Sequence, residues 1–151
     1  MPRDVWKPNV TVAAVIERAG RFLLIEEEAQ GELVLNQPAG HWEPGESLVE
    51  ASVREVLEES ACDFVPAALV GIYRAWAAPE EVIYLRFAFC GDSGEQDASR
   101  ALDEGIVRTL WLTPDEIRAS AKRHRSPLVL RCVEDYLAGR RYPLDILTHL
   151  G

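Results

Sequence analysis

Alternating apolar and polar stretches predict a β-hairpin near the start of the chain. Residues 10–16 are rich in β-branched and small apolar side chains, which favour a strand. A turn is predicted over residues 18–21, and residues 22–25 form the second apolar run. Residues 33–35 are a third, shorter strand candidate. The N-terminal part of the chain is therefore expected to be extended rather than helical.

The clearest helix is predicted for residues 47–59. Ser47, followed three positions later by Glu50, matches the capping-box pattern of a helix start. At about 100° per residue, one stripe of this helix collects Val49, Val53 and Val56. We expect the valine stripe to pack against the core and the acidic face of the helix to point away from it.

The second half of the chain mixes strands and helices without regular alternation. Three further strands are predicted, over residues 64–77, 82–90 and 106–112. Helices are predicted to begin at Thr113 and Ser126. The polar residues 91–104 show no apolar period, so we expect a loop that is either functional or mobile. This order favours an α+β fold with a mixed sheet over a doubly wound parallel sheet.

Length and composition limit the class of protein. The chain has 151 residues and a mass of 16.9 kDa, so we expect one domain spanning residues 1–151. Hydrophobic residues make up 48% and charged residues 27%, which excludes a disordered chain. Neither a signal peptide nor an apolar run of about 18 residues is visible, so no membrane association is expected. The three cysteines form no C-x-x-C pair, which favours a reducing compartment and a cytoplasmic protein.

The net charge of -9 makes a nucleic-acid polymer an unfavourable partner. The same surface would repel a phosphorylated small molecule, unless metal ions or local arginines reverse the sign of the charge at the site. A search for candidate chemistry therefore begins with acidic clusters that could bind a cation.

One such cluster lies on the predicted helix. Glu55, Glu58 and Glu59 are spaced i, i+3 and i+4, so their side chains share one face. Carboxylates at this spacing are common on solvated helix faces, and alone they carry little weight. Without a counter-charge they repel one another, and a hard divalent cation relieves that repulsion. Ligands made only of oxygen select Mg²⁺ or Mn²⁺ over zinc.

The segment before this helix has the features of a phosphate-binding loop. Gly40, Pro44 and Gly45 permit a tight backbone close to a ligand. The helix start beside such a loop favours phosphate oxygens. Arg54 lies four residues before Glu58, where its guanidinium can hold a carboxylate in place. Metal, phosphate and a spare carboxylate together indicate attack of water on a phosphoanhydride.

The complete spacing resembles the Nudix box, G-x5-E-x7-R-E-U-x-E-E-x-G-U, where U is an apolar aliphatic residue. The positions in register are Gly40, Glu46, Arg54, Glu55, Val56, Glu58 and Glu59. Six fixed matches arise by chance in about one chain in a hundred thousand, at average residue usage. Two positions depart from the box: Ala61 replaces its glycine, and Cys62 replaces the final aliphatic residue. If the box glycine needs a left-handed backbone, alanine there costs about 1 kcal/mol or more.

Three other segments extend the resemblance, in particular to the NudJ-type phosphatases of that family. They are residues 36–41, 125–129 and 141–144. The resemblance implies a Nudix αβα sandwich around a mixed sheet. It also implies Mg²⁺-dependent removal of orthophosphate from nucleoside triphosphates and diphosphates, and from thiamine pyrophosphate or its hydroxymethylpyrimidine pyrophosphate precursor.

The resemblance also assigns expected roles within the box. Glu55, Glu58 and Glu59 bind one or more Mg²⁺ ions, together with the Gly40 carbonyl. One of Glu58 and Glu59 doubles as general base, and the sequence leaves open which one. Arg54 orients Glu55 or Glu58, while Glu46 supports the loop or a second metal.

Residues outside the box are weaker candidates. We expect Arg74 and Arg86 to contact substrate, because a charged residue in an apolar strand needs a partner. His41, in the box loop, and Arg125, in a basic run, are also assigned to substrate binding. Asp103 and Glu104 are open between a ligand or base role and that of solvated loop acids. Four strand aromatics could stack on a ring but are more typical of a core: Tyr73, Trp76, Tyr84 and Phe87.

Two alternative functions stay open at this point. A Nudix enzyme could instead cleave ADP-ribose or dinucleoside polyphosphates internally, which would release a nucleoside monophosphate rather than orthophosphate. A module that binds nucleotides without turnover would retain the fold, and the Ala61 substitution is the feature that favours it. The expected partner is in each case a phosphorylated small molecule, bound by a monomer or a homodimer.

Overall fold

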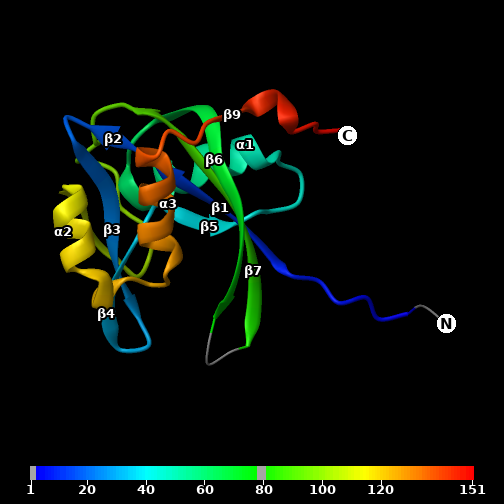
Figure 1. The fold of residues 1–151 in the computed structure, drawn as a ribbon, viewed down its shortest axis with the longest axis horizontal. Coiled ribbons are helices and arrows are strands. Elements are labelled where there is room, and N and C mark those ends of the chain that lie inside the picture. The colour runs from blue at the N-terminus through cyan, green and yellow to red at the C-terminus, as the bar shows by residue number, and fades with distance from the viewer. Residues whose placement is uncertain (1–2, 78–80) are drawn as a thin grey trace.

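The computed structural model describes residues 3–77 and 81–151, which form two β-sheets and the helices around them (Figure 1). The first sheet has the strand order β5-β1-β7-β6-β9. Its strands are β1 (Asn9–Val15), β5 (Ala39–His41), β6 (Phe64–Ala77), β7 (Val82–Ser93) and β9 (Tyr142–Pro143). Strand β1 runs parallel to β7, and the other pairs in this sheet are antiparallel. The sheet is therefore mixed, as the sequence predicted.

The second sheet is antiparallel and has strand β3 at its centre. It contains β2 (Glu17–Arg18), β3 (Arg21–Ala29), β4 (Glu32–Asn36) and β8 (Ile106–Leu112). Strands β2, β4 and β8 all pair with β3. The predicted pairing of residues 10–16 with residues 22–25 is present only next to the turn, where the short β2 pairs with β3. Strand β1 joins the first sheet instead, and β3 joins the second.

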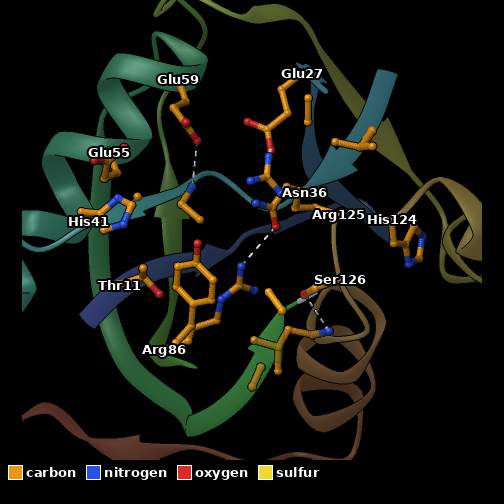
Figure 2. Close-up of a pocket in the computed structure, with 18 of the residues that line it drawn as sticks. Thr11, Glu27, Asn36, His41, Glu55, Glu59, Arg86, His124, Arg125 and Ser126 are labelled. Carbon is orange, nitrogen blue, oxygen red and sulfur yellow. Dashed lines mark hydrogen bonds and ion pairs between the residues drawn. The ribbon is translucent and has the colours of Figure 1, made fainter. Parts of the chain in front are cut away.

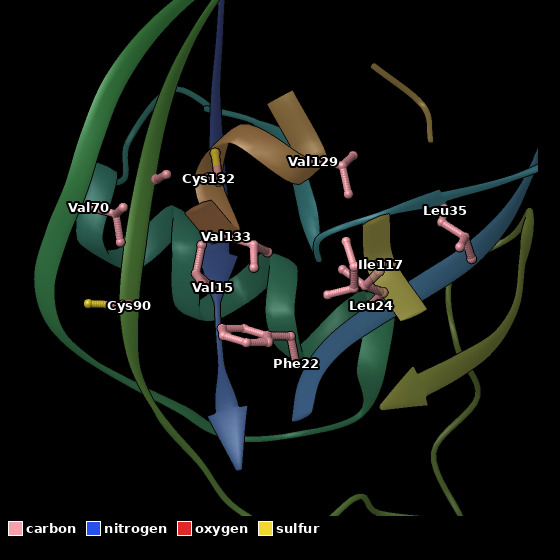
Figure 3. Close-up of a cluster of buried hydrophobic side chains, with 11 residues drawn as sticks. Val15, Phe22, Leu24, Leu35, Val70, Cys90, Ile117, Val129, Cys132 and Val133 are labelled. Carbon is pink, nitrogen blue, oxygen red and sulfur yellow. The ribbon is translucent and has the colours of Figure 1, made fainter. Parts of the chain in front are cut away.

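Helices α1 (Leu48–Ser60) and α3 (Leu128–Leu137) cover the two faces of the first sheet. Helix α2 (Pro114–Ala119) packs against β8 of the second sheet and against α3, and η1 (Ala121–Arg123) and η2 (Leu144–Ile146) are short 3₁₀ turns. Side chains on β7 alternate between two cores: Phe89 packs in the core under α1, whereas Ala88 and Cys90 pack in the core under α3 (Figure 3). This alternation produces an αβα sandwich and confirms the predicted fold class. Within the described residues, no helix is long and apolar enough to cross a membrane.

Helix α1 begins as predicted, but the face that it buries differs from the expected one. The Ser47 hydroxyl accepts a hydrogen bond from the Glu50 amide, and the capping box is complete. The buried residues are Ala51, Ser52, Glu55, Val56, Glu59 and Ser60. The buried face thus lies between the valine stripe and the acidic stripe. The expectation that the glutamates point away from the core was wrong for Glu55 and Glu59, which are only 8% exposed.

Helix α1 ends at Ala61 in the left-handed conformation that the box glycine usually supplies. Ala61 has φ 58° and ψ 28°, and its amide donates to the Leu57 carbonyl. The departure from the box therefore puts an alanine in a left-handed conformation, where glycine is less strained.

The polar loop after β7 is fastened to the end of α1. The Asp97 amide donates to the Ala61 carbonyl, and the Asp103 amide donates to the Glu58 carbonyl, both at 2.9 Å. The Gln96 side chain donates to the Ser60 carbonyl at 3.0 Å. The loop thus satisfies carbonyl groups that a helix end leaves without partners. It also carries Asp103 to the acidic face of α1.

Candidate functional site

A cavity of about 780 Å³ opens between α1, the first sheet and the segment that precedes α3 (Figure 2). Carboxylates gather on one side of it, which we call the acidic side: Glu55, Glu58, Glu59 and Asp103. Cations gather on the other, which we call the basic side: Arg86, Lys122 and Arg125. In Figure 2, Glu55 and Glu59 descend from the helix on the left, while Arg86 and Arg125 enter from the sheet and from the segment on the right.

Three carboxylates of the acidic side can reach a common point. One oxygen each of Glu55, Glu58 and Asp103 lies within 4.8 Å of the others. The helix contributes the two glutamates at i and i+3, and the fastened loop contributes the aspartate. Oxygen donors in this number suit Mg²⁺ or another hard divalent cation. The residues therefore fit a divalent metal ion by the chemistry of their donor atoms.

The glycine that opens the box is required by the packing of Glu55. A Cβ atom built at Gly40 would lie 2.1 Å from the Glu55 carboxyl carbon and 2.1 Å from one of its oxygens. A side chain there would force the Glu55 carboxylate to move, because that carboxylate lies directly against the backbone of strand β5. Gly40 and Glu55 therefore determine each other's position at the acidic side.

Arg54 holds the box together through its ion pairs. Its Nε and Nη2 atoms donate to the two carboxylate oxygens of Glu46, at 2.9 and 2.7 Å. Its Nη1 atom donates to Glu55 at 2.8 Å and to Glu58 at 3.2 Å. The carbonyl of His41 accepts a further bond at 3.0 Å. The predicted orienting role of Arg54 is consistent with this geometry, since one guanidinium links the loop to two of the three clustered carboxylates.

Glu46 is engaged by the loop rather than by the carboxylate cluster. Its carboxylate accepts both bonds from Arg54 and a third from the Glu43 amide at 3.0 Å. The Arg54 hydrogen bonds hold the pKa of Glu46 below its usual value. The resemblance left two roles open for Glu46. Its contacts with Arg54 and with the Glu43 amide favour support of the loop over binding of a second metal.

Glu59 occupies a separate position from the three clustered carboxylates. Its Oε1 accepts a hydrogen bond from the Ala39 amide at 2.8 Å. Burial raises the pKa of Glu59 to about 8, and this hydrogen bond opposes the rise only in part. Burial also raises the pKa of Glu55, against the effect of Arg54. A bound cation would favour the ionised forms of both carboxyl groups.

Arg86 is buried on strand β7 and lines the basic side. Its Nη2 donates to the Asn36 side-chain oxygen at 3.1 Å, and its Nη1 donates to the Gln37 side-chain oxygen at 3.0 Å. A longer contact of 3.8 Å joins Nη1 to the sulfur of Cys132 on α3. The structure therefore places Arg86 at the cavity, and its partners within the described residues are all neutral.

The basic run before α3 divides between the cavity and the core. Lys122 and Arg125 line the cavity, and Arg125 also contacts Glu27 at 3.4 Å. Arg123 instead pairs with the buried Glu26, which also accepts a bond from Arg108 at 3.0 Å. Arg125 is therefore placed where it can meet a substrate, whereas Arg123 ties the segment to β3.

The remaining substrate-binding candidates separate in the same way. His41 lines the cavity next to Tyr84, with ring centroids 6.3 Å apart. Arg74 is exposed and does not line the cavity, so the structure does not bring it to this site. Among the aromatics, Trp76 and Tyr84 line the cavity. Tyr73 instead donates to Asp135 at 2.8 Å, and Phe87 packs against the core under α1.

Sequence reasoning underrated three residues of the site. Asp103 was left open with Glu104, yet only Asp103 joins the carboxylate cluster. Asn36 and Gln37 were noticed as part of a resembling segment but received no role, although both orient Arg86. The sequence contained one clue to these roles: Arg86 is a charged residue in an apolar strand and needs polar partners, and Asn36 and Gln37 are adjacent amide side chains elsewhere in the chain. No local spacing connects residues 36 and 86.

Comparisons with known proteins agree on one family. A family model described as the NUDIX domain matches residues 6–132. The phosphatase NudJ of Escherichia coli strain K12 is 38% identical over 143 residues, which cover 95% of this chain and 92% of that protein. The NudJ phosphatase of Shigella flexneri is similar to the same extent.

Solved structures show the same fold. A Nudix hydrolase from Nitrosomonas europaea superposes with a TM-score of 0.93 at 55% identity, over 95% of this chain and 98% of that one. A MutT Nudix hydrolase from Burkholderia pseudomallei has a TM-score of 0.72 at 20% identity, over 86% of this chain and 98% of that one. The second likeness is evidence for the fold alone.

Proposed function

Because the chain belongs to the Nudix hydrolase family, we propose that it uses Mg²⁺ to remove orthophosphate from phosphoanhydrides. The proposed substrates are nucleoside triphosphates and diphosphates, together with thiamine pyrophosphate or hydroxymethylpyrimidine pyrophosphate. The similarity to the NudJ phosphatases supports terminal cleavage. The single observation that carries the proposal is the pair of opposite charges across one cavity, with clustered carboxylates facing a buried arginine.

The carboxylate cluster would hold the cation. We assign this role to Glu55 and Glu58 on α1 and to Asp103 on the loop, with Glu59 and the Gly40 carbonyl as further expected ligands. When bound, the divalent cation supplies positive charge that offsets the charge of the phosphate oxygens and of the transition state. Arg54 fixes the orientation of Glu55 and Glu58 and so keeps their oxygens directed to one point.

Glu59 is the better placed of the two general-base candidates. Its carboxyl group is buried, and burial raises its pKa above that of an exposed carboxyl group, so the ionised form that a bound cation favours is a stronger base. The Ala39 amide fixes the direction of one of its oxygens. Glu58, in contrast, is occupied by Arg54 and shares the cluster with Asp103. We therefore propose Glu59 as the base that accepts a proton from the attacking water.

We also propose that residues 1–151 act as a single catalytic domain. Strand β9 near the C-terminus pairs with β6 of the first sheet, and Leu144 and Leu147 pack against the core under α1. The C-terminal segment therefore shares the core of the sheet that carries Arg86.

The experiment that tests this function measures phosphate release with Mg²⁺ across a panel of diphosphates and triphosphates, with identification of both products. We expect orthophosphate as a product, and we expect Glu59→Gln to reduce turnover at least about 100-fold, since a positioned base contributes about 10²–10⁴. Unchanged turnover in Glu59→Gln would contradict its role as a base. Release of a nucleoside monophosphate from ADP-ribose or a dinucleotide would identify internal cleavage instead.

A matched control lies on the same helix. Glu50 faces solvent and closes the capping box, and glutamine can perform the same capping role. Glu50→Gln is therefore expected to retain wild-type turnover. If the wild-type protein leaves every compound of the panel intact after long incubation, the chain is a binding module and the catalytic proposal fails.

A further inference from the structure

Arg86 is the most deeply buried cation that lines the cavity. Its exposed fraction is 6%, whereas the side chains of Arg54 and Arg125 are 22% and 48% exposed. Arg54 and Arg125 each have carboxylate partners. Within residues 3–77 and 81–151, Arg86 has none, because its contacts are with Asn36, Gln37 and Cys132. The deepest positive charge of the site therefore has no counter-charge among the residues that the structure describes.

The neutral partners of Arg86 orient it without neutralising it. Gln37 donates to the Val129 carbonyl at 2.7 Å and uses its oxygen to accept from Arg86. This chain of bonds fixes the guanidinium against β4 and α3. A guanidinium has five N–H donors, and three contacts are made here, so donors remain for a ligand.

A charge in such a position needs an anion. Burying an ion without a compensating charge is costly, and the cost falls when a ligand brings the opposite charge. A phosphate group meets the requirement better than the neutral carbonyl of a base, because both partners are then charged. The first turn of α3 adds a favourable field, since Ser126 and Leu128 at its start also line the cavity (Figure 2).

We propose that Arg86 and Asn36 form a subsite for the terminal phosphate of the substrate. This inference rests on the proposed function, and it adds the direction in which the substrate enters. The phosphate end goes in first and reaches Arg86, while the organic group stays at the rim of the cavity. The rim carries Trp76, which is 58% exposed, and the half-buried Tyr84. Such aromatics accept rings of several kinds, because stacking needs only a flat face.

This orientation determines which bond is cleaved. The oxygen of water forms a bond to the terminal phosphorus, and the bond from that phosphorus to the bridging oxygen breaks. The bridging oxygen leaves with the organic phosphate, and a proton from the water passes to Glu59. The terminal group becomes orthophosphate, which remains at Arg86 until it dissociates. Terminal cleavage thus follows from holding the terminal phosphate at Arg86, across the cavity from the carboxylates.

The binding test uses inorganic phosphate as the probe. Its affinity is measured by calorimetry and by the shift of the unfolding temperature, in the Mg²⁺-loaded protein and again in EDTA. We expect Arg86→Gln to weaken phosphate binding at least about tenfold in both conditions, since hydrogen bonds between charged groups are strong. Arg100→Gln is the control, because Arg100 is exposed, does not line the cavity and interacts only with Asp97 among the acids of the described residues.

Asn36→Asp is a second variant, used because Arg86→Gln could lose phosphate binding simply by disturbing the fold. It is nearly isosteric, it retains the hydrogen bond to Arg86, and it gives the guanidinium a carboxylate partner. We expect it to weaken phosphate binding about as much as Arg86→Gln, although Arg86 stays in place. If Asn36→Asp binds phosphate as the wild type does, the charge argument fails and the subsite is overturned. Absence of phosphate binding to the wild-type protein would overturn it as well.

The product test separates this inference from the proposed function. With a nucleoside triphosphate and Mg²⁺, Arg86→Gln is expected to release at least about tenfold less orthophosphate relative to pyrophosphate than the wild type. If Arg86→Gln instead changes the preference among organic groups and leaves the products unchanged, Arg86 recognises the organic group and the subsite is wrong. Phosphate binding that depends on Arg86 without any turnover would contradict the proposed function and retain the subsite.

Discussion

The acidic and basic sides of the cavity differ in how the chain assembles them. Three of the four carboxylates on the acidic side come from one stretch of α1, and Arg54 on the same helix orients two of them. The basic side instead combines residues from β7 and the segment before α3, and Arg86 on β7 is held by Asn36 of β4, so these groups meet only after folding. A local motif can therefore specify the acidic side, whereas the basic side depends on the whole fold.

The two sides also differ in how their charges are compensated. Carboxylates on the acidic side are partly balanced by Arg54, and the remaining repulsion calls for a cation. Arg86 on the basic side is surrounded by neutral acceptors. Each side thus carries an excess of opposite charge, and the proposed metal–phosphate complex would supply both missing charges. The following changes would break or sharpen this contrast, from the largest expected effect to the smallest.

Gly40→Ala is expected to disable the acidic side most strongly. The new Cβ would lie 2.1 Å from the Glu55 carboxyl group, so the carboxylate must move out of the cluster. A displacement of about 1 Å can cost about 100-fold in rate, and we expect at least that loss in kcat/KM for phosphate release. Gly94→Ala is the control, because the nearest atom to its Cβ is 3.9 Å away. Equal activity of the two variants would show that Glu55 is not needed in its present position.

Asp103→Asn tests whether the fastened loop belongs to the acidic side. Removing one charged oxygen donor is expected to weaken Mg²⁺ or Mn²⁺ binding about 10- to 100-fold. Titration calorimetry with Mn²⁺ and the Mg²⁺ dependence of turnover both measure this loss. The adjacent Glu104 lies outside the cluster, so Glu104→Gln is expected to bind metal as the wild type does. If Glu104→Gln weakens metal binding more than Asp103→Asn does, Asp103 is not a metal ligand.

Gln37→Leu tests how strongly the basic side depends on its distant partners. The change leaves the Val129 carbonyl without the Gln37 amide and takes one acceptor from Arg86. Buried polar groups left without partners cost about 1–3 kcal/mol each, so we expect a loss of this size in the free energy of unfolding. Denaturation in urea measures it. A loss below about 0.5 kcal/mol would show that water replaces Gln37 and that the network does not hold Arg86.

The buried Glu59 predicts a specific dependence of stability on pH in the metal-free protein. Its pKa rises from 4.5 in the unfolded chain to about 8 in the folded one. Between these values the folded state binds the proton and the unfolded state does not, so stability falls as the pH rises. Thermal unfolding in EDTA from pH 5 to about 9 measures this slope. Glu59→Gln is expected to flatten it, and an identical slope in the two proteins would contradict the raised pKa.

Ala61→Gly is expected to give the smallest effect, and a favourable one. Ala61 has φ 58°, where alanine is strained by about 1 kcal/mol and glycine is not. The greater entropy of glycine in the unfolded chain offsets part of the gain, so the net stabilisation should be about 0.5 kcal/mol. Ala138→Gly at the end of α3 is the matched control, because its φ is -73° and glycine should destabilise there. A stability gain without a change in kcat would show that the departure from the box does not affect the metal ligands.

These comparisons show which parts of the molecule could be predicted from sequence. The capping box of α1 and the long strand β6 follow from local patterns, and the structure has them where they were expected. The buried face of α1 could not be predicted from the valine stripe. Two residues of the acidic stripe, Glu55 and Glu59, are buried as well, and the backbone of Gly40 lies against Glu55. The assumption that charged residues stay exposed fails where a site needs them inside.

Contacts between distant segments account for the rest. The role of Asp103 depends on a hydrogen bond from its amide to the Glu58 carbonyl, which no spacing in the sequence encodes. Arg74 and Arg86 were indistinguishable as charged residues in apolar strands. Their paired strands place Arg86 in the interior of the sheet, opposite Tyr73, and leave Arg74 exposed. Burial, rather than residue type, separates the two arginines.

Hydrogen bonds between the loop and the end of α1 couple exposure of the helix end to the position of Asp103. Asp97 and Gln96 occupy the carbonyl groups of Ala61 and Ser60, and Asp103 bonds the carbonyl of Glu58. Any displacement of this loop would expose the last turn of the helix to solvent and would also remove Asp103, a proposed metal donor, from the cluster. Chelation should therefore be visible as faster hydrogen exchange at the amides of Asp97 and Asp103, far along the chain from the motif that identifies the enzyme.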